Sequence, residues 1–435
     1  MIPANESAHN AHIGLEDCSL PENWNIVPLR RKCFLNTGAT PSRSRSDFWQ
    51  GDINWFSSKD LKSKLLPDSE EKITHLAVDT TGLRLHPAGT LVACFRSGIL
   101  RHTFPVAIGT EPFTVNQDLR AITLSQDCSS HFVLYYLMGM NNSILASCRK
   151  IGATVESIET KWFLDYPLVV PPLLDQQLTI DFLDEKTAEI DGLVGKLERE
   201  VELLERYRRE LIAHTVTRGL DPDVPMRDSG IDWIGKIPSH WKTASISTIT
   251  DENKIKNSDL SEKNLLSLSY GKIIRKDIDL AFGLLPASFD AYQVLENGYI
   301  VLRMTDLQND KRSLRSAIAK EKGIITGAYI GLKTRSSISP DYLAWLLRFY
   351  DLAKVFYSLG GGVRQSANYK EIGKTAALVP PLEEQEQIAN FLDKTSLEID
   401  STISNINKQI ELLAKYRKQV INDTVTGRIR LGGEA

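Results

Sequence analysis

The sequence is poor in cysteine and has no long hydrophobic run. Only five of its 435 residues are cysteines, an odd number without CxxC spacing. This pattern argues against a disulfide framework or a structural zinc site and is typical of reduced thiols. No apolar run approaches the roughly 18 residues of a membrane span. The first ten residues have neither a basic nor an apolar region, so no signal peptide is expected. We therefore expect a cytoplasmic protein without a membrane partner.

The motifs of covalent chemistry are absent as well. There is no GxSxG nucleophile and no glycine loop for a dinucleotide or a methyl donor. Residues 230–236 match GxxxxGK formally, but Ile237 and Pro238 replace the metal-binding hydroxyl and the start of a helix. The charged run at 67–72 faintly resembles a nuclease pattern, yet its carboxylates are too close in sequence to come from two strands. We expect no catalytic residue, no metal site and no cofactor in this chain.

The charge is nearly balanced overall but unevenly distributed. The formal net charge is −3, and the segments 1–168, 169–224, 225–377 and 378–435 contribute −1, −6, +6 and −2. A pI near neutrality argues only weakly against nucleic acid, because the third segment is basic.

One long stretch is present twice. Residues 170–217 recur as 379–426 without a gap, at an offset of 209, and 20 of the 48 aligned positions are identical. Each copy opens with Pro-Pro, which is compatible with a helix start. The N–H groups of the first helical turn have no partner within the helix, so a proline there costs no hydrogen bond. Apolar residues then follow at alternating spacings of four and three, the heptad seam of a helix that needs a partner. The predicted seam residues are Ile190, Val194, Leu197, Val201, Leu204, Leu211, Ile399, Ile403, Ile406, Ile410, Leu413 and Val420.

The simplest partner for each helix is the other copy. A helix from 175 to 217 would be roughly 65 Å long at 1.5 Å per residue, more than an ordinary domain needs. Arg208 and Arg417 interrupt the seam at equivalent positions. Each guanidinium must reach solvent or a carboxylate, so the pair could fix the register of the two helices.

The repeat extends beyond the helices. Residues 132–138 and 341–347 are short apolar helices at the same offset, and Leu20–Trp24 resembles Ile237–Trp241, now 217 apart. The period near 210 gives the order globule, helix, globule, helix. Short runs of β-branched and aromatic residues between turns predict an α+β fold for each globule. Residues 218–240 are rich in Pro, Gly and Asp, which predicts a surface linker. The predicted domains are 1–168, a helix at 169–222, 223–377, and a second helix at 378–435.

Polar and basic residues gather in loops of both globules. Residues 37–45 combine Gly, Pro, hydroxyls and two arginines ahead of an aromatic strand, and 360–368 combine three glycines with Arg, Gln and Asn. Such residues donate to phosphates and read base edges. Lys311, Arg312 and Arg315 form another basic cluster. The residues predicted to contact DNA are Thr40, Ser42, Arg43, Arg45, Lys59, Arg96, Arg101, Lys272, Arg275, Lys276, Arg303, Lys311, Arg312, Arg364, Gln365, Asn368 and Lys370.

These motifs together resemble the specificity subunit of a type I restriction–modification enzyme. The resemblance rests on LPENW at 20–24, TGATPS at 37–42, FWQGDINWFSSKDL at 48–61, and the paired VPPL…Q…FLD…EID…LL…YR…TVT segments. It implies two α/β target-recognition domains, each reading one part of a bipartite site in double-stranded DNA. It also implies that the helices form an antiparallel coiled coil about a pseudo-two-fold axis, as a spacer between the domains.

The resemblance further implies the partners. Two methyltransferase subunits carrying S-adenosylmethionine would dock on the helices, and a restriction subunit using ATP and Mg²⁺ would complete the enzyme. The second half departs from the pattern, because no TGATP loop follows Trp241. The two half-sites should therefore differ.

Two alternatives stay open. A duplicated coiled-coil scaffold could assemble other proteins without touching DNA. A stand-alone endonuclease is the other, disfavoured by the missing metal-binding carboxylates.

Overall fold

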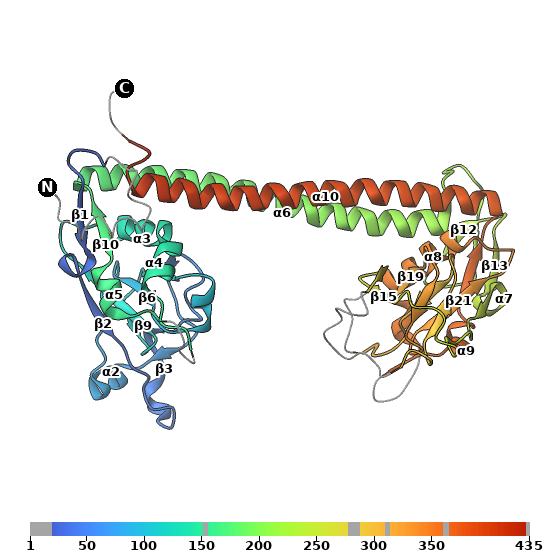
Figure 1. Ribbon diagram of the computed structural model, residues 1–435, viewed down its shortest axis with the longest axis horizontal. Helices are drawn as coiled ribbons and strands as arrows, with labels where there is room; N and C mark the ends of the chain where they lie inside the picture. The colour runs from blue at the N-terminus through green and yellow to red at the C-terminus, as the bar shows by residue number, and fades with distance from the viewer. Residues whose placement is uncertain (1–19, 151–154, 277–287, 309–313, 360–364, 432–435) are drawn as a thin grey trace. The chain divides into compact units, whose positions relative to one another are not determined.

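A computed structural model describes residues 20–150, 155–276, 288–308, 314–359 and 365–431. The chain forms two compact units, Met1–Leu197 with Lys408–Ala435, and Glu198–Asn407. Two long helices, α6 (Leu173–Arg218) and α10 (Leu382–Val425), each contribute to both units (Figure 1). In the part of the chain described, no helix has the length and apolar composition needed to cross a membrane.

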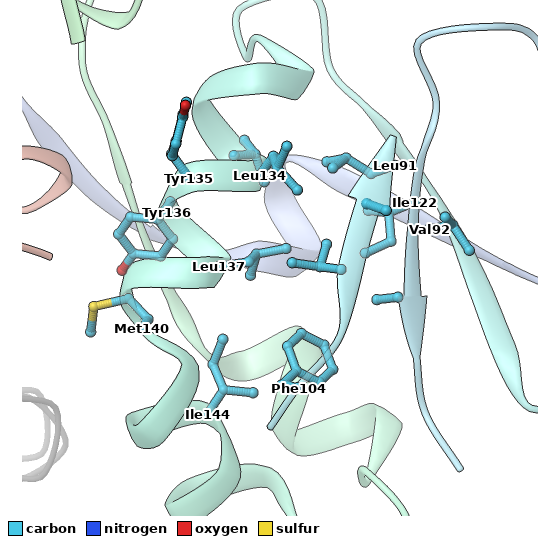
Figure 2. Close-up of a cluster of buried hydrophobic side chains, with 14 of the residues drawn as sticks. Leu91, Val92, Phe104, Ile122, Leu134, Tyr135, Tyr136, Leu137, Met140 and Ile144 are labelled. Carbon is cyan, nitrogen blue, oxygen red and sulfur yellow. The ribbon is translucent and has the colours of Figure 1, made fainter. Parts of the chain in front are cut away.

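The first unit is built on a five-stranded sheet in the order β2-β9-β6-β7-β4. All pairings are antiparallel except β4 with β7. The central strand β6 (Leu91–Cys94) is buried along its whole length because helix α3 packs against the sheet. Figure 2 shows Leu134 and Leu137 of α3 directed toward Leu91 and Ile122 of the strands. The other elements have these bounds: β2 Cys33–Thr37, β4 Leu65–Leu66, β7 Val106–Gly109, β9 Leu119–Leu124, α3 Ser130–Gly139, α4 Asn141–Cys148 and α5 Thr160–Asp165.

A smaller sheet of the same unit holds the predicted recognition loop. Strand β3 (Trp49–Phe56) pairs with β5 (Lys72–Ile73) and, in parallel, with β8 (Phe113–Val115). Helix α2 (His75–Thr81) covers it, capped by the Thr74 hydroxyl. Phe48, Trp55 and Ile73 belong to the separate small core at this sheet.

The second unit has a four-stranded antiparallel sheet in the order β14-β21-β18-β19. Helix α8 (Pro340–Leu352) packs on it as α3 does in the first unit, in line with the predicted pair of apolar helices. The remaining elements are β13 Lys242–Ser245, α7 Ile246–Ile249, β14 Thr250–Glu252, β15 Leu266–Ser269, β16 Lys272–Arg275, β17 Gln293–Leu295, β18 Ile300–Leu302, β19 Ser316–Ile318, β20 Gly323–Ile325, β21 Ile330–Thr334, α9 Tyr369–Ile372 and β22 Ala376–Val379.

The stretch predicted to be a surface linker is instead partly folded into the second unit. Strands β11 (Met226–Asp228) and β12 (Lys236–Pro238) pair as an antiparallel hairpin. Ile237 is fully buried, and Trp233 packs its ring edge-on against Tyr350 at 4.9 Å. The linker prediction was wrong here because the apolar residues between the turn residues find a core. The formal GxxxxGK match lies within this hairpin.

Equivalent contacts anchor each globule to the start of a long helix. In the first unit, Gln176 of α6 accepts from the Ser129 backbone N–H at 2.8 Å and donates to the carbonyls of Asp127 and Pro171. In the second, Gln385 of α10 accepts from Ser339 N–H at 2.7 Å and donates to the carbonyls of Ser337 and Pro380. Both glutamines are buried, and each satisfies a backbone N–H at the N-terminus of α3 or α8.

A tryptophan repeats the same anchoring. Trp24 donates its indole N–H to Asp175 at 2.8 Å, and Trp241 donates to Glu384 at 3.0 Å. The short terminal strands are equivalent too: β1 (Asn25–Pro28) pairs with β10 (Pro167–Val170), and β13 pairs with β22. The same local structure thus occurs twice, although Trp24 and Trp241 are 217 residues apart and their acceptors Asp175 and Glu384 are 209 apart.

Replacing the buried glutamine should destabilise the unit that contains it. In Gln176→Leu, two carbonyls and one N–H lose their partner in a buried site, so we expect a loss of roughly 2–4 kcal/mol. Calorimetric unfolding measures this as a lower melting temperature. Gln177→Leu is the matched control, because Gln177 is exposed and its side chain donates to Asp181 on the same helix at 2.7 Å. Equal melting temperatures for the two variants would contradict the anchoring role.

The long helices pack on each other within each unit. Near its start, α6 contributes Ile180 and Leu183 to the same core as Val420 and Val425 near the end of α10. In the second unit the end of α6 shares a core with the start of α10. The helices therefore run antiparallel, which confirms the predicted coiled coil.

Two reciprocal ion pairs link the helices at the seam. Arg208 donates to Asp400 at 2.6 Å in the second unit, and Arg417 donates to Asp191 at 2.8 Å in the first. The repeat offset of 209 converts Asp191 into Asp400 and Arg208 into Arg417. The contact of Arg208 with Asp400 in the second unit is thus repeated in the first by the equivalents of the same two residues, Arg417 and Asp191.

Candidate nucleic-acid interface

The loop between β2 and β3 is folded around its arginines. The Arg43 guanidinium lies 3.8 Å from the centre of the Trp49 ring and forms a two-pronged ion pair with Glu71. The Trp49 indole in turn donates to the Ser42 carbonyl at 3.1 Å. The bond to Glu71 raises the pKa of Arg43 and lowers that of Glu71. The loop therefore has a defined conformation, with Arg43 more than half exposed on its surface.

Neighbouring candidates of this loop are also exposed. Arg45 donates to Asp47 at 2.8 Å and lies over the Phe48 ring. Thr40 donates to Gln117 at 2.6 Å, and the Ser42 hydroxyl contacts that of Ser44. Exposed ion pairs of this kind are weak, so an incoming phosphate can replace the carboxylate at small cost.

Three further candidates of the first unit lie outside this loop. Lys59 is exposed in the turn after β3. Arg96 and Arg101 belong to the connection between β6 and β7, where the Arg101 side chain pairs with Glu156 at 3.3 Å. The loop and this connection are separate groups of basic side chains.

In the second unit the candidates lie on the β15–β16 hairpin. Arg275 forms a two-pronged pair with Glu321, and Lys272 lies 3.4 Å from Asp400 of α10. Lys276 is exposed just after the hairpin. Lys272 is itself 75% exposed, so its bond to the helix leaves most of its surface open to a ligand.

The predicted cluster around 311–315 and the glycine loop at 360–368 lie only partly within the described residues. Lys311, Arg312 and Arg364 lie outside the described residues. Arg315 is fully buried and donates to the carbonyls of Thr305 and Asp306. Its assignment to a basic surface cluster was wrong, because its guanidinium satisfies backbone carbonyls inside the fold.

Two predicted base-reading residues also have structural roles. The Gln365 amide donates to the carbonyls of Tyr357 and Leu359. The Asn368 side chain caps α9 in a capping box with Glu371. Lys370 is exposed on α9, and Arg303 is half-buried with its backbone N–H bonded to Arg315. Gln and Asn are residue types that can read bases, but their presence in the sequence did not distinguish a recognition loop from a helix cap.

The predicted seam residues are all buried or half-buried, whereas most positions between them are exposed. Outside the seam, a pair of apolar residues recurs at the repeat offset. Leu203 and Tyr207 are 49% and 52% exposed, and Leu412 and Tyr416 are 62% and 53% exposed. Residues four apart lie on one helix face. We call these the apolar pairs; large apolar side chains left in water at repeated positions indicate a contact surface.

In the described ranges, no three His, Cys, Asp or Glu side chains are placed together so as to hold a metal ion. Burial raises the pKa of Cys33 and of Cys148 to about 12, so neither thiol is a nucleophile at neutral pH.

Sequence reasoning missed the carboxylates that bind the seam arginines. Asp191 and Asp400 are identical residues at the repeat offset, as are Arg208 and Arg417. Two acid–base pairs at one offset were a usable signal for reciprocal bonds.

Comparison with known proteins gives one consistent family. Residues 21–203 match the family described as "Type I restriction modification DNA specificity domain". The chain is 31% identical to the Escherichia coli EcoR124I/EcoR124II specificity subunit over 40% of this chain and 44% of that relative, so the match spans less than half of its length. It is 24% identical to the Methanocaldococcus jannaschii MjaVIII specificity subunit over 68% of this chain and 70% of the relative.

The fold has solved counterparts as well. The crystal structure of the HsdS subunit from Thermoanaerobacter tengcongensis aligns with a TM-score of 0.54 at 12% identity, covering 95% of this chain and 99% of that one. At this identity the similarity concerns the fold.

Proposed function

We propose that this chain, whose residues 21–203 match the type I restriction–modification DNA specificity domain, is a specificity subunit that reads a bipartite, asymmetric site in double-stranded DNA. Residues 1–168 would read one half-site and 223–377 the other. The segments 169–222 and 378–435 would set the distance between them. Methylation of adenine and cleavage would be carried out by partner subunits.

The observation that supports this proposal most is the duplication of the anchors without duplication of the loops. Gln176 and Gln385 make the same three bonds, and Trp24 and Trp241 the same contact. The exposed loops nevertheless differ between the units: 37–45 beside β3 in one, and the β15–β16 hairpin in the other. Two units with the same anchoring contacts but different exposed loops are suited to reading two different half-sites.

Charge supports the same division of labour. The segment 225–377 has a formal charge of +6, and the helical segment 169–224 of −6. Lys and Arg supply most of the affinity of proteins for DNA through phosphates. An acidic helix repels phosphates and is better suited to protein partners.

We assign those partners to two methyltransferase subunits, one at each apolar pair, and to a restriction subunit. S-adenosylmethionine would be bound by the methyltransferase, and ATP with Mg²⁺ by the restriction subunit. The chain itself would contribute no reacting group. The complex would act in the cytoplasm, where its DNA is.

Mapping of methyladenine tests the proposal. Genomic DNA from the host, from a strain lacking this gene, and from that strain with the gene restored is sequenced by a method that detects N6-methyladenine. We expect one motif of two short parts around an unread spacer, lost on deletion and regained on restoration.

The scaffold alternative predicts a different result. If the chain only assembles proteins, no methylated motif should depend on it, and its complexes should be insensitive to salt. DNA binding through several phosphates should instead weaken by orders of magnitude between 50 and 200 mM salt, about 10³-fold for six contacts. A motif unchanged by deletion would contradict the proposal.

A further inference from the structure

The tip of the β15–β16 hairpin exposes a single aromatic side chain. Four residue pairs join the strands, from Leu266 with Arg275 to Ser269 with Lys272. Tyr270 and Gly271 form the two-residue turn. The Tyr270 side chain is 85% exposed, more than any other large apolar residue among those described.

The backbone of this turn is unusual for a tyrosine. Tyr270 has φ +44° and Gly271 φ +73°. Positive φ at both central residues defines a type I′ turn, for which Asn-Gly or Asp-Gly is the preferred sequence. A tyrosine in this conformation is strained. Its presence there does not help the turn to form.

The rest of the fold holds the tip in place. Arg348 of α8 donates to the Gly271 carbonyl at 2.5 Å and to the Ser316 carbonyl at 2.7 Å. A Cβ on Gly271 would lie 2.4 Å from the Arg348 guanidinium, so the contact leaves no free space. Lys272 reaches Asp400 and Arg275 reaches Glu321 on either side. The part-buried bonds of Arg348 therefore hold the turn against α8, and the two exposed ion pairs add smaller contributions.

Across the residues that the structure describes, the Tyr270 phenol has no hydrogen-bonding partner and its ring no aromatic neighbour. Strained residues held by a rigid surrounding tend to occur at functional sites. The nearest exposed cations in sequence are Lys272, Arg275 and Lys276, of which Arg275 is paired with Glu321. These positive charges suit an anionic ligand with flat apolar faces.

We propose that Tyr270 is a base-contacting residue of the second unit, whose ring packs against a base of the half-site that this unit reads. Lys272 and Lys276 bind phosphates of the flanking backbone, and Arg348 is a positioning residue that fixes the tip. An aromatic ring gains affinity by stacking on a base or by wedging into a base step. This inference rests on the proposed function and adds to it a specific contact that involves no charged group.

Three variants distinguish the effect of the Tyr270 ring on DNA binding from an effect of the turn conformation. Tyr270→Asn removes the ring and supplies the preferred type I′ residue, so its melting temperature should be equal to or above that of the wild type. Tyr270→Phe keeps the ring and loses the hydroxyl. Leu260→Asn is the matched control, because Leu260 also has positive φ, +56°, and is 49% exposed in the same unit.

The variants are compared as complexes with the methyltransferase. The probe is a fluorescent duplex of about 40 base pairs carrying the motif found by methyladenine mapping, and anisotropy is measured over a series of salt concentrations. Tyr270→Asn should bind roughly tenfold or more weakly, as expected for loss of one stacking contact. The slope against salt should not change, because no phosphate contact is lost. Tyr270→Phe and Leu260→Asn should bind like the wild type.

The outcomes distinguish this inference from its premise. Equal binding by Tyr270→Asn and the wild type, or an equal loss in Tyr270→Phe, would overturn the role of the ring while leaving the proposed function intact. A wild-type complex that does not prefer this duplex to a scrambled one would overturn the proposed function itself.

Discussion

Insertion of one heptad into each long helix should change the DNA site that is modified. We expect seven residues after Gly195 and seven after Ser404, its equivalent at the offset of 209, to lengthen each helix by about 10 Å. That length corresponds to about three base pairs at 3.4 Å each. The unread spacer of the methylated motif should grow by about three base pairs, and the two half-sites should stay the same. Methylation at the original sites should disappear.

The seam explains why the insertions must be matched. A heptad preserves the alternation of four and three, so the apolar stripe continues through the added turns. Both insertions fall between the arginine and the aspartate of their own helix, since 195 lies between Asp191 and Arg208, and 404 between Asp400 and Arg417. The matched change can therefore keep both reciprocal ion pairs.

An insertion in α6 alone is the informative control. It would add two turns opposite an unchanged α10, so the seam or one ion pair must be broken. Breaking the seam exposes apolar side chains such as Ile190 and Ile399 that are buried between the helices. The loss of one ion pair adds little, because its carboxylate is 40% or 58% exposed. We expect this single insertion to lower the melting temperature and to abolish methylation. If matched insertions altered either half-site sequence, the helices would not act as the spacer.

The helices were predictable because their information is local and occurs twice. The heptad pattern, the Pro-Pro start and the offset of 209 are all visible in the sequence, and the antiparallel packing within each unit confirms the coiled coil. Arg208 and Arg417 stood out as interruptions of an apolar stripe. That a charged group there must reach solvent or a carboxylate follows from electrostatics alone, but which of the two it reaches does not.

The recognition surface was less predictable, because residue type does not reveal burial. Arg315, Gln365 and Asn368 have the donors that read DNA, but they satisfy backbone groups in this fold. Which donor is used internally depends on tertiary contacts over tens of residues. Tyr270 shows the reverse case: a Tyr-Gly dipeptide does not signal a type I′ turn, and its exposure follows only from the paired strands around it.

Removing the apolar pairs should remove the methyltransferase subunits one at a time. Leu203→Ser with Tyr207→Ala affects one pair, and Leu412→Ser with Tyr416→Ala the other. Exposed tyrosines that become buried on binding are frequent hot spots, worth at least 2 kcal/mol each, or roughly 30-fold in affinity. We expect either double variant to bind one methyltransferase copy and the quadruple variant none. Native mass spectrometry of the reconstituted complex counts the copies.

Leu193 provides the matched control for this surface. It is 43% exposed on α6, but its equivalent at the repeat offset is Thr402, so its apolar character is not repeated. Leu193→Ser should bind both copies with unchanged affinity. The apolar pairs lie outside the seam, and each of their side chains is about half exposed or more. Replacing them should therefore leave the melting temperature of the free chain nearly unchanged. A quadruple variant that still binds two copies would show that the repeated residues are not the docking surface. A loss confined to one pair would show that the two helices bind their partners differently, although both carry an exposed leucine and tyrosine at equivalent positions.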